Sequence, residues 1–315
     1  MAHRGPELAA AYATCRSIAR REAKNFYYAF LALPRHKSDA MCAVYAFMRR
    51  ADDIADDESL SIDARRATMA EWTAAFRQAQ SGEATSDPVF LALLDTQQQF
   101  GISGSLLQDL VRGTTMDLDE QRDASAQTNN GANHFHPQQY ETFGDLYEYC
   151  YLVASVVGLV CIRIFGYTDQ RAEKLAEKTG IAFQLTNILR DVREDVERGR
   201  VYLPQKDLEE FSVSGEELAG IKDGRKLTLN QRELLEFQAQ RAREYYKAAD
   251  DLLPLIEADS RPALWVLVTI YRSLLDRIDA KSYDVFTKRI KVGKLKKLSI
   301  LSVGLARAAA NRMGL

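Results

Sequence analysis

The chain has 315 residues, of which 46% are hydrophobic and 27% are charged. This composition can build a sizeable core, and a net charge of −2 from 42 basic and 44 acidic residues excludes a general attraction to nucleic acid. Four cysteines lack metal-site spacing and are expected in the core of a protein from a reducing compartment: Cys15, Cys42, Cys150 and Cys161. Because the N-terminus shows no secretory signal and no apolar run approaches the roughly 20 residues that span a bilayer, we expect a cytoplasmic location.

Helical periodicity dominates the chain, and we expect one all-α domain over residues 1–315. Phe26, Phe30 and Leu33 follow helical spacing near the N-terminus, and the seven prolines leave long uninterrupted tracts. Strand signals are weak, because no turn dipeptide joins two alternating runs. Polar residues predict surface loops at 81–88 and at Asp123–Pro137, and the second loop is expected to be mobile.

A first acidic stripe lies in the segment Ala43–Asp57, which reads AVYAFMRRADDIADD. At about 100° per residue, one side of a helix in this segment carries four polar side chains: Tyr45, Arg49, Asp52 and Asp56.

A second stripe follows later in the chain, in the run QLTNILRDVRED. Helical spacing again places four polar side chains along one line: Gln184, Asn187, Asp191 and Asp195. Two such helices facing one cavity would suit Mg²⁺, which binds oxygen ligands, keeps several waters and is often completed by substrate phosphates. Such an ion would neutralise a diphosphate leaving group as its bond to carbon breaks.

The alternative interpretation of each stripe is a solvated helix surface on which neighbouring arginines pair with the acids. Two observations favour the metal site instead. Like charges four residues apart are mildly destabilising, so their repetition on two helices needs a reason. In addition, Gln184 and Asn187 extend the second stripe onto a face that would otherwise be apolar.

At these stripes the sequence resembles the squalene/phytoene synthase family. Ala43–Asp57 resembles the first aspartate-rich motif of the family, and FQLTNILRDVREDVERGRVYLP at Phe183–Pro204 resembles the second. Tyr147–Leu159 is similar to the helix between the motifs, and Lys24–Pro34 is similar to the N-terminal segment. The resemblance extends from about residue 16 to residue 301. It implies an isoprenoid-synthase bundle around a deep apolar cavity.

The resemblance also implies roles for individual residues. The ligands of Mg²⁺, or of Mn²⁺ in its place, are expected to be Asp52, Asp56, Asn187, Asp191 and Asp195. Basic side chains expected to contact phosphate are Lys24, Arg49, Arg190, Arg200 and Arg289. Residues expected at the reaction centre are Tyr45, Arg49, Tyr149, Gln184 and Asn187, with Tyr202 and Tyr271 beside the substrate. Small residues expected to admit a prenyl tail are Val153, Ala154 and Gly158. Near the N-terminus the sequence departs from the usual family pattern, so Lys24 is the only residue of that segment that we expect to contact phosphate.

The implied reaction joins two prenyl diphosphates head to head and releases diphosphate. The VASVVGL wall favours farnesyl diphosphate and a C30 product of the presqualene or squalene type, as used for hopanoids. Phytoene, a carotenoid precursor made from two geranylgeranyl diphosphates, is the alternative. The sequence has no GxGxxG after a strand, so it leaves the use of NADPH open. A non-catalytic relative that serves as a binding module is a further alternative, although the four aspartates of the two motifs argue against it.

The C-terminal segment Lys288–Leu315 is basic and then apolar. This pattern is typical of a helix that lies on an anionic membrane surface, but also of a packed final helix with a solvated basic side. Peripheral association with the inner face of the membrane, and contact with downstream isoprenoid enzymes, are therefore expectations that the sequence alone leaves open.

Overall fold

The first part of the chain forms helices that pack around α3. A computed structural model describes residues 5–128, 138–221 and 225–312 of the protein. The helices of the first part are α1 (Pro6–Glu22), α2 (Lys24–Phe30), α3 (Arg35–Ala55), α4 (Ile62–Gln80), α5 (Pro88–Phe100) and α6 (Gly104–Thr128). Helix α3 contacts α1, α5 and α6, and α1 also contacts α5.

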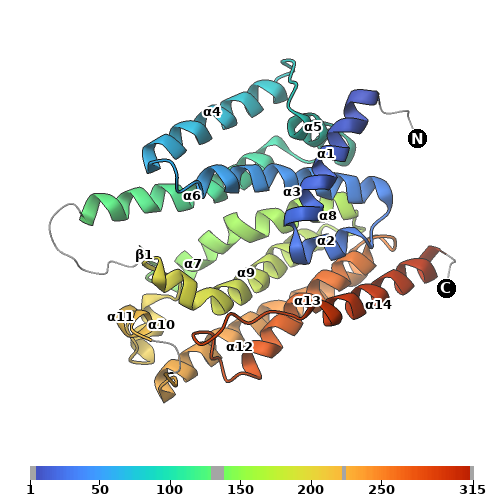
Figure 1. The fold of residues 1–315 in the computed structure, drawn as a ribbon. Coiled ribbons are helices and arrows are strands. Elements are labelled where there is room, and N and C mark those ends of the chain that lie inside the picture. Colours follow the sequence, from blue (N-terminus) through green and yellow to red (C-terminus); the bar gives the residue numbers. More distant parts are fainter. Residues whose placement is uncertain (1–4, 129–137, 222–224, 313–315) are drawn as a thin grey trace.

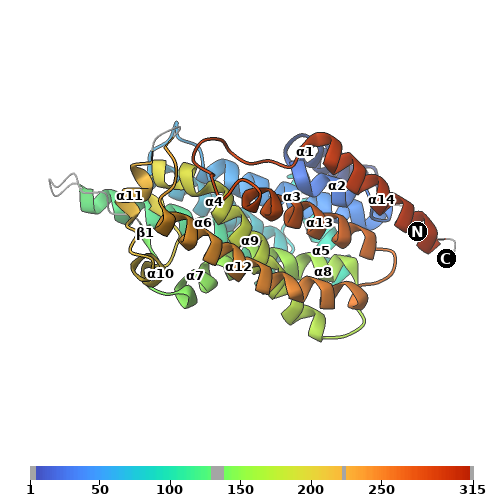
Figure 2. The same cartoon turned by 90° about the horizontal axis from the view of Figure 1, so that it is seen from below.

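The second part of the chain packs mainly around α9. Its helices are α7 (Phe143–Cys150), the π-helical turn η1 (Tyr151–Ser155), α8 (Val156–Phe165), α9 (Arg171–Glu197), α10 (Gln205–Glu210), α11 (Gly215–Ala219), α12 (Leu229–Leu252), the 3₁₀ turn η2 (Leu253–Leu255), α13 (Arg261–Asp279) and α14 (Lys294–Arg312). The long helices lie roughly side by side in layers in Figure 1, and Figure 2 shows α9 and α12 next to each other from below. The predicted all-α fold is confirmed.

Local side-chain signals begin several of these helices. The hydroxyl of Ser61 accepts a hydrogen bond from the N–H of Ala64 at the start of α4, and the carboxylate of Asp87 does the same for α5. Pro88 then occupies the first position of α5, where a missing N–H costs nothing. Capping boxes begin three further helices at Thr142, Ser214 and Thr228.

The polar tract predicted as a loop is partly helical. Helix α6 continues to Thr128, so the loop prediction is wrong for residues 123–128, while residues 129–137 lie outside the described residues. Before Asn129 the tract reads DASAQT and lacks glycine and proline, and its two alanines favour continuation of a helix once α6 has formed. Beyond it, β1 (Gln138–Gln139) pairs in parallel with β2 (Arg200–Val201).

A continuous helical stretch, Phe143–Phe165, is long and apolar enough to cross a membrane by length and composition. The sequence-based expectation overlooked it because tyrosine, serine and glycine interrupt its aliphatic runs. Half of its most apolar window is buried inside the protein, where η1 and α8 pack on α9. A core helix passes the same test, so this stretch is weak evidence for a membrane span.

Close backbone contacts hold the π-helical turn η1 between α6 and α9. A Cβ atom at Gly180 of α9 would lie 2.7 Å from Ser155 Cα and 2.9 Å from the carbonyl oxygen of Ala154. On the other side, a Cβ atom at Gly113 of α6 would lie 2.8 Å from the carbonyl oxygen of Leu152. The two glycines therefore allow both helices to approach the backbone of η1. The segment Tyr147–Leu159, which resembles the helix between the family's motifs, is helical throughout and changes from α to π geometry at this turn.

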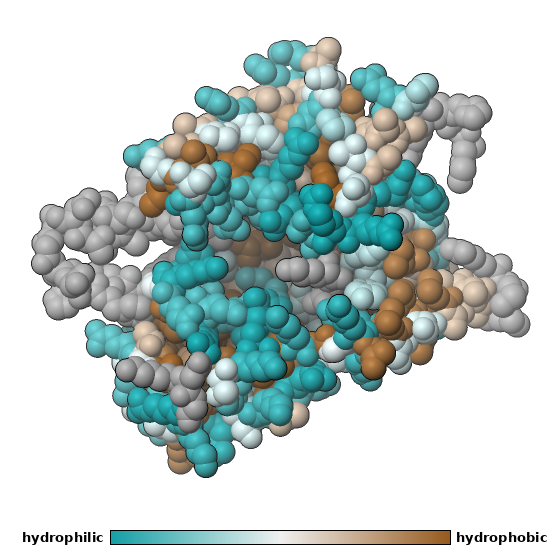
Figure 3. All heavy atoms as spheres, in the orientation of Figure 1, coloured by the Kyte–Doolittle hydropathy of each residue, from teal (hydrophilic) through white to brown (hydrophobic). Residues whose placement is uncertain are grey.

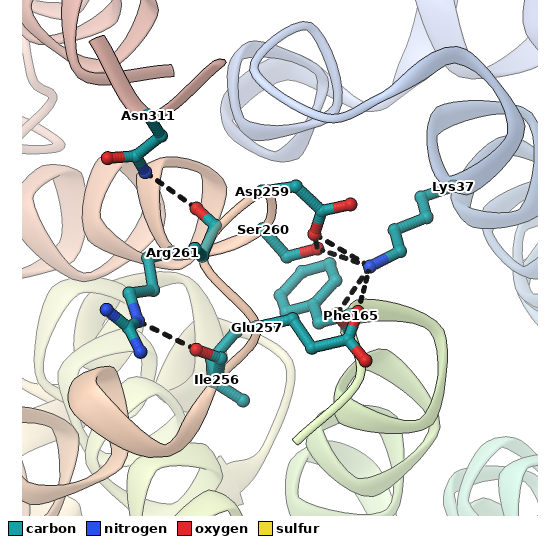
Figure 4. A network of polar contacts seen from close by, with 9 residues as sticks. Lys37, Phe165, Ile256, Glu257, Asp259, Ser260, Arg261 and Asn311 are labelled. Atoms are coloured by element: carbon teal, nitrogen blue, oxygen red, sulfur yellow. Dashed lines mark hydrogen bonds and ion pairs between the residues drawn. The ribbon is translucent and has the colours of Figure 1, made fainter. Parts of the chain in front are cut away.

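A buried lysine joins three distant parts of the chain (Figure 4). The ammonium of Lys37, whose residue is 5% exposed, donates to the carbonyl oxygen of Phe165 at 2.8 Å and to the Ser260 hydroxyl at 3.0 Å. It also pairs with the carboxylates of Glu257 at 2.8 Å and Asp259 at 2.7 Å. These four contacts satisfy a charge that would be costly to bury alone. The lysine thus fixes the start of α3 to the end of α8 and to the loop before α13.

Candidate active site

A cavity of about 840 Å³ lies between the two halves of the bundle. Its walls come from α2, α3, η1, α8, α9 and α13, and from the segment that precedes α14. Most of the wall is apolar, including Phe26, Phe30, Met48, Val157, Phe183, Leu264 and Leu267. The face drawn in Figure 3 is hollowed between the upper and lower layers, with hydrophilic side chains at the rim. Such a space suits a long apolar chain that carries a polar head group.

The first stripe enters this cavity from the C-terminal half of α3. Tyr45, Arg49 and Asp52 line it, as their helical spacing predicts. Burial raises the pKa of Tyr45 to about 12, so its hydroxyl stays protonated near neutral pH. Arg49 pairs with Asp53, while its Nε atom is buried without a hydrogen-bond partner among the described residues.

Asp56 differs from the other members of the first stripe. Its role as a metal ligand stays a prediction, because it is exposed and does not line the cavity. The reason is that α3 ends at Ala55 and Asp56 occupies the C-cap, with φ of −94° and ψ of 3°. Its N–H still donates to the carbonyl oxygen of Asp52 at 2.8 Å, so Asp56 lies one turn beyond the cavity wall.

The second stripe enters the cavity from the middle of α9. Gln184, Asn187 and Arg190 line it opposite α3. The amide nitrogen of Asn187 donates to Gln184 Oε1 at 3.4 Å, but Asn187 Oδ1 is buried with no partner in the described part of the chain. Because Asn187 lines the cavity, this acceptor can take a hydrogen bond from, or contact a cation within, whatever the cavity holds. The two stripes therefore meet across one cavity.

Asp191 lies between two arginines that line the cavity. Arg190 donates to it through Nε at 2.7 Å, and Arg289 pairs with it at 2.8 Å and with Glu194 at 3.3 Å. Burial alone would raise the pKa of Asp191, but the hydrogen bond and charge of Arg190 outweigh burial and hold it below its usual range. Asp191 is therefore ionised at neutral pH and orients Arg190 and Arg289.

The other predicted residues near the end of α9 lie apart from the large cavity. Asp195, Arg200 and Tyr202 line a separate hollow of about 10 Å³. Burial, followed by the charge of nearby Asp191, raises the pKa of Asp195 to about 7. Tyr149 stacks on Tyr202 with ring centroids 5.1 Å apart and does not line the large cavity. The structure thus places Tyr149 and Tyr202 in an aromatic group beside the cavity, and their chemical roles stay predictions.

The small residues predicted to admit a prenyl tail do line the cavity. Val153 and Ala154 come from η1, and Gly158 comes from the first turn of α8. A Cβ atom at Gly158 would lie 3.1 Å from the carbonyl oxygen of Ala176. Close packing against α9 is therefore a second explanation for a glycine at this position, beside the width that the cavity needs for a prenyl tail.

Tyr271 of α13 also lines the cavity and stacks on Phe183, with ring centroids 4.4 Å apart. Phe183 and Tyr271 thus present aromatic surface near the polar end formed by Asn187 and Arg190. Lys24 begins α2, but its side chain lies outside the described part of the structure.

Sequence reasoning missed several residues of the cavity wall. Phe26 and Phe30 of α2 were identified only by their periodicity, which does not distinguish a cavity wall from a packed core. Lys291, Lys294 and Lys297 were seen as part of a basic run, and the structure adds that all three line the cavity. Spacing relative to α14 could not reveal this, because the lysines follow an irregular segment.

The donor set has the chemistry of a site for a hard cation. Within the described residues, no three acidic, histidine or cysteine side chains form a metal-binding cluster by themselves. The candidate ligands are instead oxygen atoms from two helices, including the unpaired Oδ1 of Asn187 and the clustered carboxylates of Asp191 and Asp195. Such an open set fits an ion that keeps waters and is completed by phosphate oxygens.

The family model of the squalene/phytoene synthases matches residues 19–296. The chain is 36% identical to the 15-cis-phytoene synthase of Synechococcus elongatus, over 96% of this chain and 94% of that protein. It is 34% identical to the phytoene synthase of Mycobacterium bovis, over 95% and 92% of the two chains. Among solved structures, a dehydrosqualene synthase in complex with a ligand has a TM-score of 0.81 and 32% identity, and covers 96% of this chain and 98% of its own.

The chain therefore belongs to the squalene/phytoene synthase family, which consists of prenyltransferases that condense two prenyl diphosphates head to head. This confirms the family, the fold and the enzyme class that the two motifs predicted. The relatives named here favour the phytoene alternative over the C30 product that the VASVVGL wall suggested.

Proposed function

We propose that the protein condenses two molecules of geranylgeranyl diphosphate to phytoene and that the reaction requires Mg²⁺. The observation that supports this substrate is the identity of 33–36% with eight phytoene synthases, over at least 93% of this chain. Farnesyl diphosphate is the competing substrate, because the chain is 32% identical to a dehydrosqualene synthase. In both cases the cavity would hold the prenyl chains and its polar end would hold the diphosphates.

The polar residues of the cavity would bind and orient the diphosphate groups. Arg49, Arg190 and Arg289 line the cavity and carry guanidinium groups suited to phosphate oxygens. Asp52 and Asn187, which line the cavity, would hold Mg²⁺ together with Asp191, which binds the cavity residues Arg190 and Arg289. Asp195 in its separate hollow and Asp56 one turn beyond Asp52 would complete the set that the resemblance implies. When bound, Mg²⁺ supplies positive charge that stabilises the diphosphate leaving group.

The apolar part of the cavity would protect the carbocation that forms when the first diphosphate leaves. The C2–C3 double bond of the second molecule attacks that cation, and loss of a proton gives a cyclopropylcarbinyl diphosphate. A second ionisation, rearrangement and proton loss then give phytoene without a hydride donor. Tyr45, Phe183 and Tyr271 offer aromatic faces to these cations, and the surrounding side chains exclude water. NADPH is therefore outside the proposed reaction.

Product analysis tests the choice of substrate. The purified protein is incubated with Mg²⁺ and either farnesyl or geranylgeranyl diphosphate, with and without NADPH, and the products are identified by mass spectrometry. We expect a C40 product from geranylgeranyl diphosphate, in an amount that NADPH does not change. A C30 product as the main outcome, with little turnover of geranylgeranyl diphosphate, would reverse the choice of substrate.

Metal removal tests whether the reaction requires a divalent cation. After treatment with EDTA, diphosphate release should fall to background, and added Mg²⁺ or Mn²⁺ should restore it. Full turnover by the metal-free protein would overturn the proposed requirement for an ion while leaving the choice of prenyl chain untouched.

A further inference from the structure

The end of the chain combines an unusual charge with an unusual surface. From Val285 to Arg312 the sequence contains eight basic residues and no acidic one, although the whole chain has a net charge of −2. The basic residues are Lys288, Arg289, Lys291, Lys294, Lys296, Lys297, Arg307 and Arg312. Six of them lie between residues 288 and 297, directly before and within the first turn of α14.

Helix α14 exposes apolar side chains to solvent. Seven large hydrophobic side chains are exposed among the described residues, and four of them lie on this helix. They are Leu295 (84% exposed), Leu298 (48%), Val303 (43%) and Leu305 (43%), which we call the α14 outer face. Figure 3 shows hydrophobic surface gathered over this end of the molecule. A concentration of exposed apolar residues on one helix marks an interaction site more often than scattered ones do.

The opposite side of α14 is also apolar. Ile300, Leu301 and Ala308 are buried, and α14 packs on α13. Between these buried positions, the exposed residues from Leu298 to Ala309 are uncharged except for Arg307, whose guanidinium lies 4.0 Å from the centre of the Trp265 ring. Ser299 and Ser302 are polar members of this exposed set, but most of it is apolar and lies opposite a side that is already buried. The α14 outer face therefore needs a further apolar environment.

The same segment borders the cavity. Lys291, Gly293 and Lys294 line the cavity and are themselves exposed, so they form part of its rim. The α14 outer face begins at Leu295, the next residue along the chain. An apolar surface placed here would lie beside the route by which prenyl substrates enter and the product leaves.

We propose that the α14 outer face docks on an anionic lipid bilayer, with the basic residues at 288–297 on the lipid head groups and the cavity rim at the membrane surface. This inference rests on the proposed function, because a product with a long apolar chain has to be transferred into lipid. Leucines on one side with lysines beside them are typical of interfacial helices, and clustered lysines bind anionic lipid. A second copy of this chain is a poorer partner, because it would bring an equally basic segment to the same face.

Vesicle flotation with the full-length protein tests the proposal. The vesicles contain phosphatidylcholine alone or with about one third phosphatidylglycerol, so that only the second kind attracts a basic segment. The double variant Leu295→Glu/Leu298→Glu alters two side chains that do not line the cavity. Leu229→Glu is the matched control, because Leu229 is 58% exposed at the start of α12.

We expect the wild type and the Leu229 variant to float with anionic vesicles and to remain in solution with neutral ones. The double variant should bind anionic vesicles about tenfold or more weakly, because it removes two apolar contacts and adds two negative charges. Its diphosphate release in detergent solution should equal that of the wild type. Salt should weaken the binding of the wild type, since part of it is electrostatic.

Three results would overturn the proposal. They are a wild type that does not float with anionic vesicles, a double variant that floats as well as the wild type, and sedimentation showing that the same substitutions dissociate a dimer. The last result would assign the α14 outer face to self-association. Loss of turnover by the wild type in detergent would instead refute the proposed function, and the flotation result would still stand by itself.

Discussion

Arg289 forms an ion pair with Asp191 at 2.8 Å, and this contact joins the segment before α14 to the middle of α9. The same guanidinium lies 3.3 Å from Glu194, and Asp191 is also bound by Arg190. Because Arg190 and Arg289 both line the cavity, the pair directs positive charge to the place where we propose that diphosphate binds. The C-terminal segment is thus part of the site although it lies far from both motifs in the sequence.

Replacement of this arginine should weaken substrate binding. We expect Arg289→Ala to raise KM for the prenyl diphosphate by about tenfold to a hundredfold, because a charge-assisted contact to phosphate is lost. Asp191 keeps its contact with Arg190, so the helical circular dichroism spectrum should not change. Arg307→Ala is the control, since Arg307 does not line the cavity. An unchanged KM in Arg289→Ala would remove Arg289 from the diphosphate site.

The carboxylates of the two stripes should be essential for turnover. Asp52→Asn and Asp191→Asn each keep the shape of the side chain but remove a negative charge needed by the ion. We expect diphosphate release to fall by at least about a hundredfold in each variant, with the helical fold intact. Asp63→Asn, an exposed acid at the start of α4, should retain full turnover. Full activity in Asp52→Asn or Asp191→Asn would exclude that residue from the proposed metal site.

Helical spacing in the sequence predicts much of this site, and it fails where the outcome depends on helix ends or on tertiary packing. Tyr45, Arg49 and Asp52 line the cavity because they share one face of α3. Asp56 follows Asp52 by one helical turn, as the spacing predicts, but the spacing cannot show that α3 ends at Ala55 and leaves Asp56 exposed beyond the cavity wall. The separation of Asp195 and Arg200 from the large cavity depends on packing beyond α9. Such tertiary packing leaves no periodic pattern in the sequence.

The contact between α9 and η1 gives a prediction about stability. Gly180→Ala would place a Cβ atom 2.7 Å from Ser155 Cα, and the backbone on both sides would have to move. We expect the free energy of unfolding to fall by about 1–3 kcal/mol, measured by urea denaturation. Gly104→Ala is the matched control, because its new Cβ atom would meet only side-chain atoms at 3.8 and 3.9 Å. Equal stability of the two variants would show that the backbone of η1 can move away from the new Cβ atom at little cost in free energy.

The sequence predicts the helical class of the fold but not its local exceptions. Apolar periodicity and rare prolines indicate helices throughout, and the structure agrees. The π-helical turn at η1 had no signal, because it arises from two glycines that are far apart in sequence, Gly113 and Gly180. The burial of Lys37 also has no signal in the sequence, since the partners that allow it come from α8 and from the loop before α13.

The cysteines give a prediction about chemical reactivity. Burial raises the pKa of Cys15, Cys42 and Cys161 to about 12 each, and also raises the pKa of Cys150. A raised pKa leaves less thiolate at a given pH, so at pH 8 the buried thiols of Cys15, Cys42 and Cys150 should react with a disulfide reagent on the order of a thousandfold more slowly than in denaturant. The absorbance of the released reagent group, followed in native buffer and in denaturant, measures the two reaction rates. Rapid reaction of Cys15, Cys42 or Cys150 in the native protein would contradict their burial, whereas Cys161 is half-buried and lines the cavity.

The contacts of Lys37 have a consequence for biosynthesis. Its four partners lie 128 to 223 residues further along the chain, so they leave the ribosome long after α3. Until then the nascent N-terminal half exposes the apolar side chains of the cavity wall. Its Lys37 ammonium group also lacks the partners that surround it in the finished protein. Exposed apolar surface of this kind makes an incomplete chain prone to aggregation. A chain that ends before Glu257 keeps only the Phe165 carbonyl among the four partners of Lys37, so we expect it to leave the junction of α3, α8 and α13 unformed.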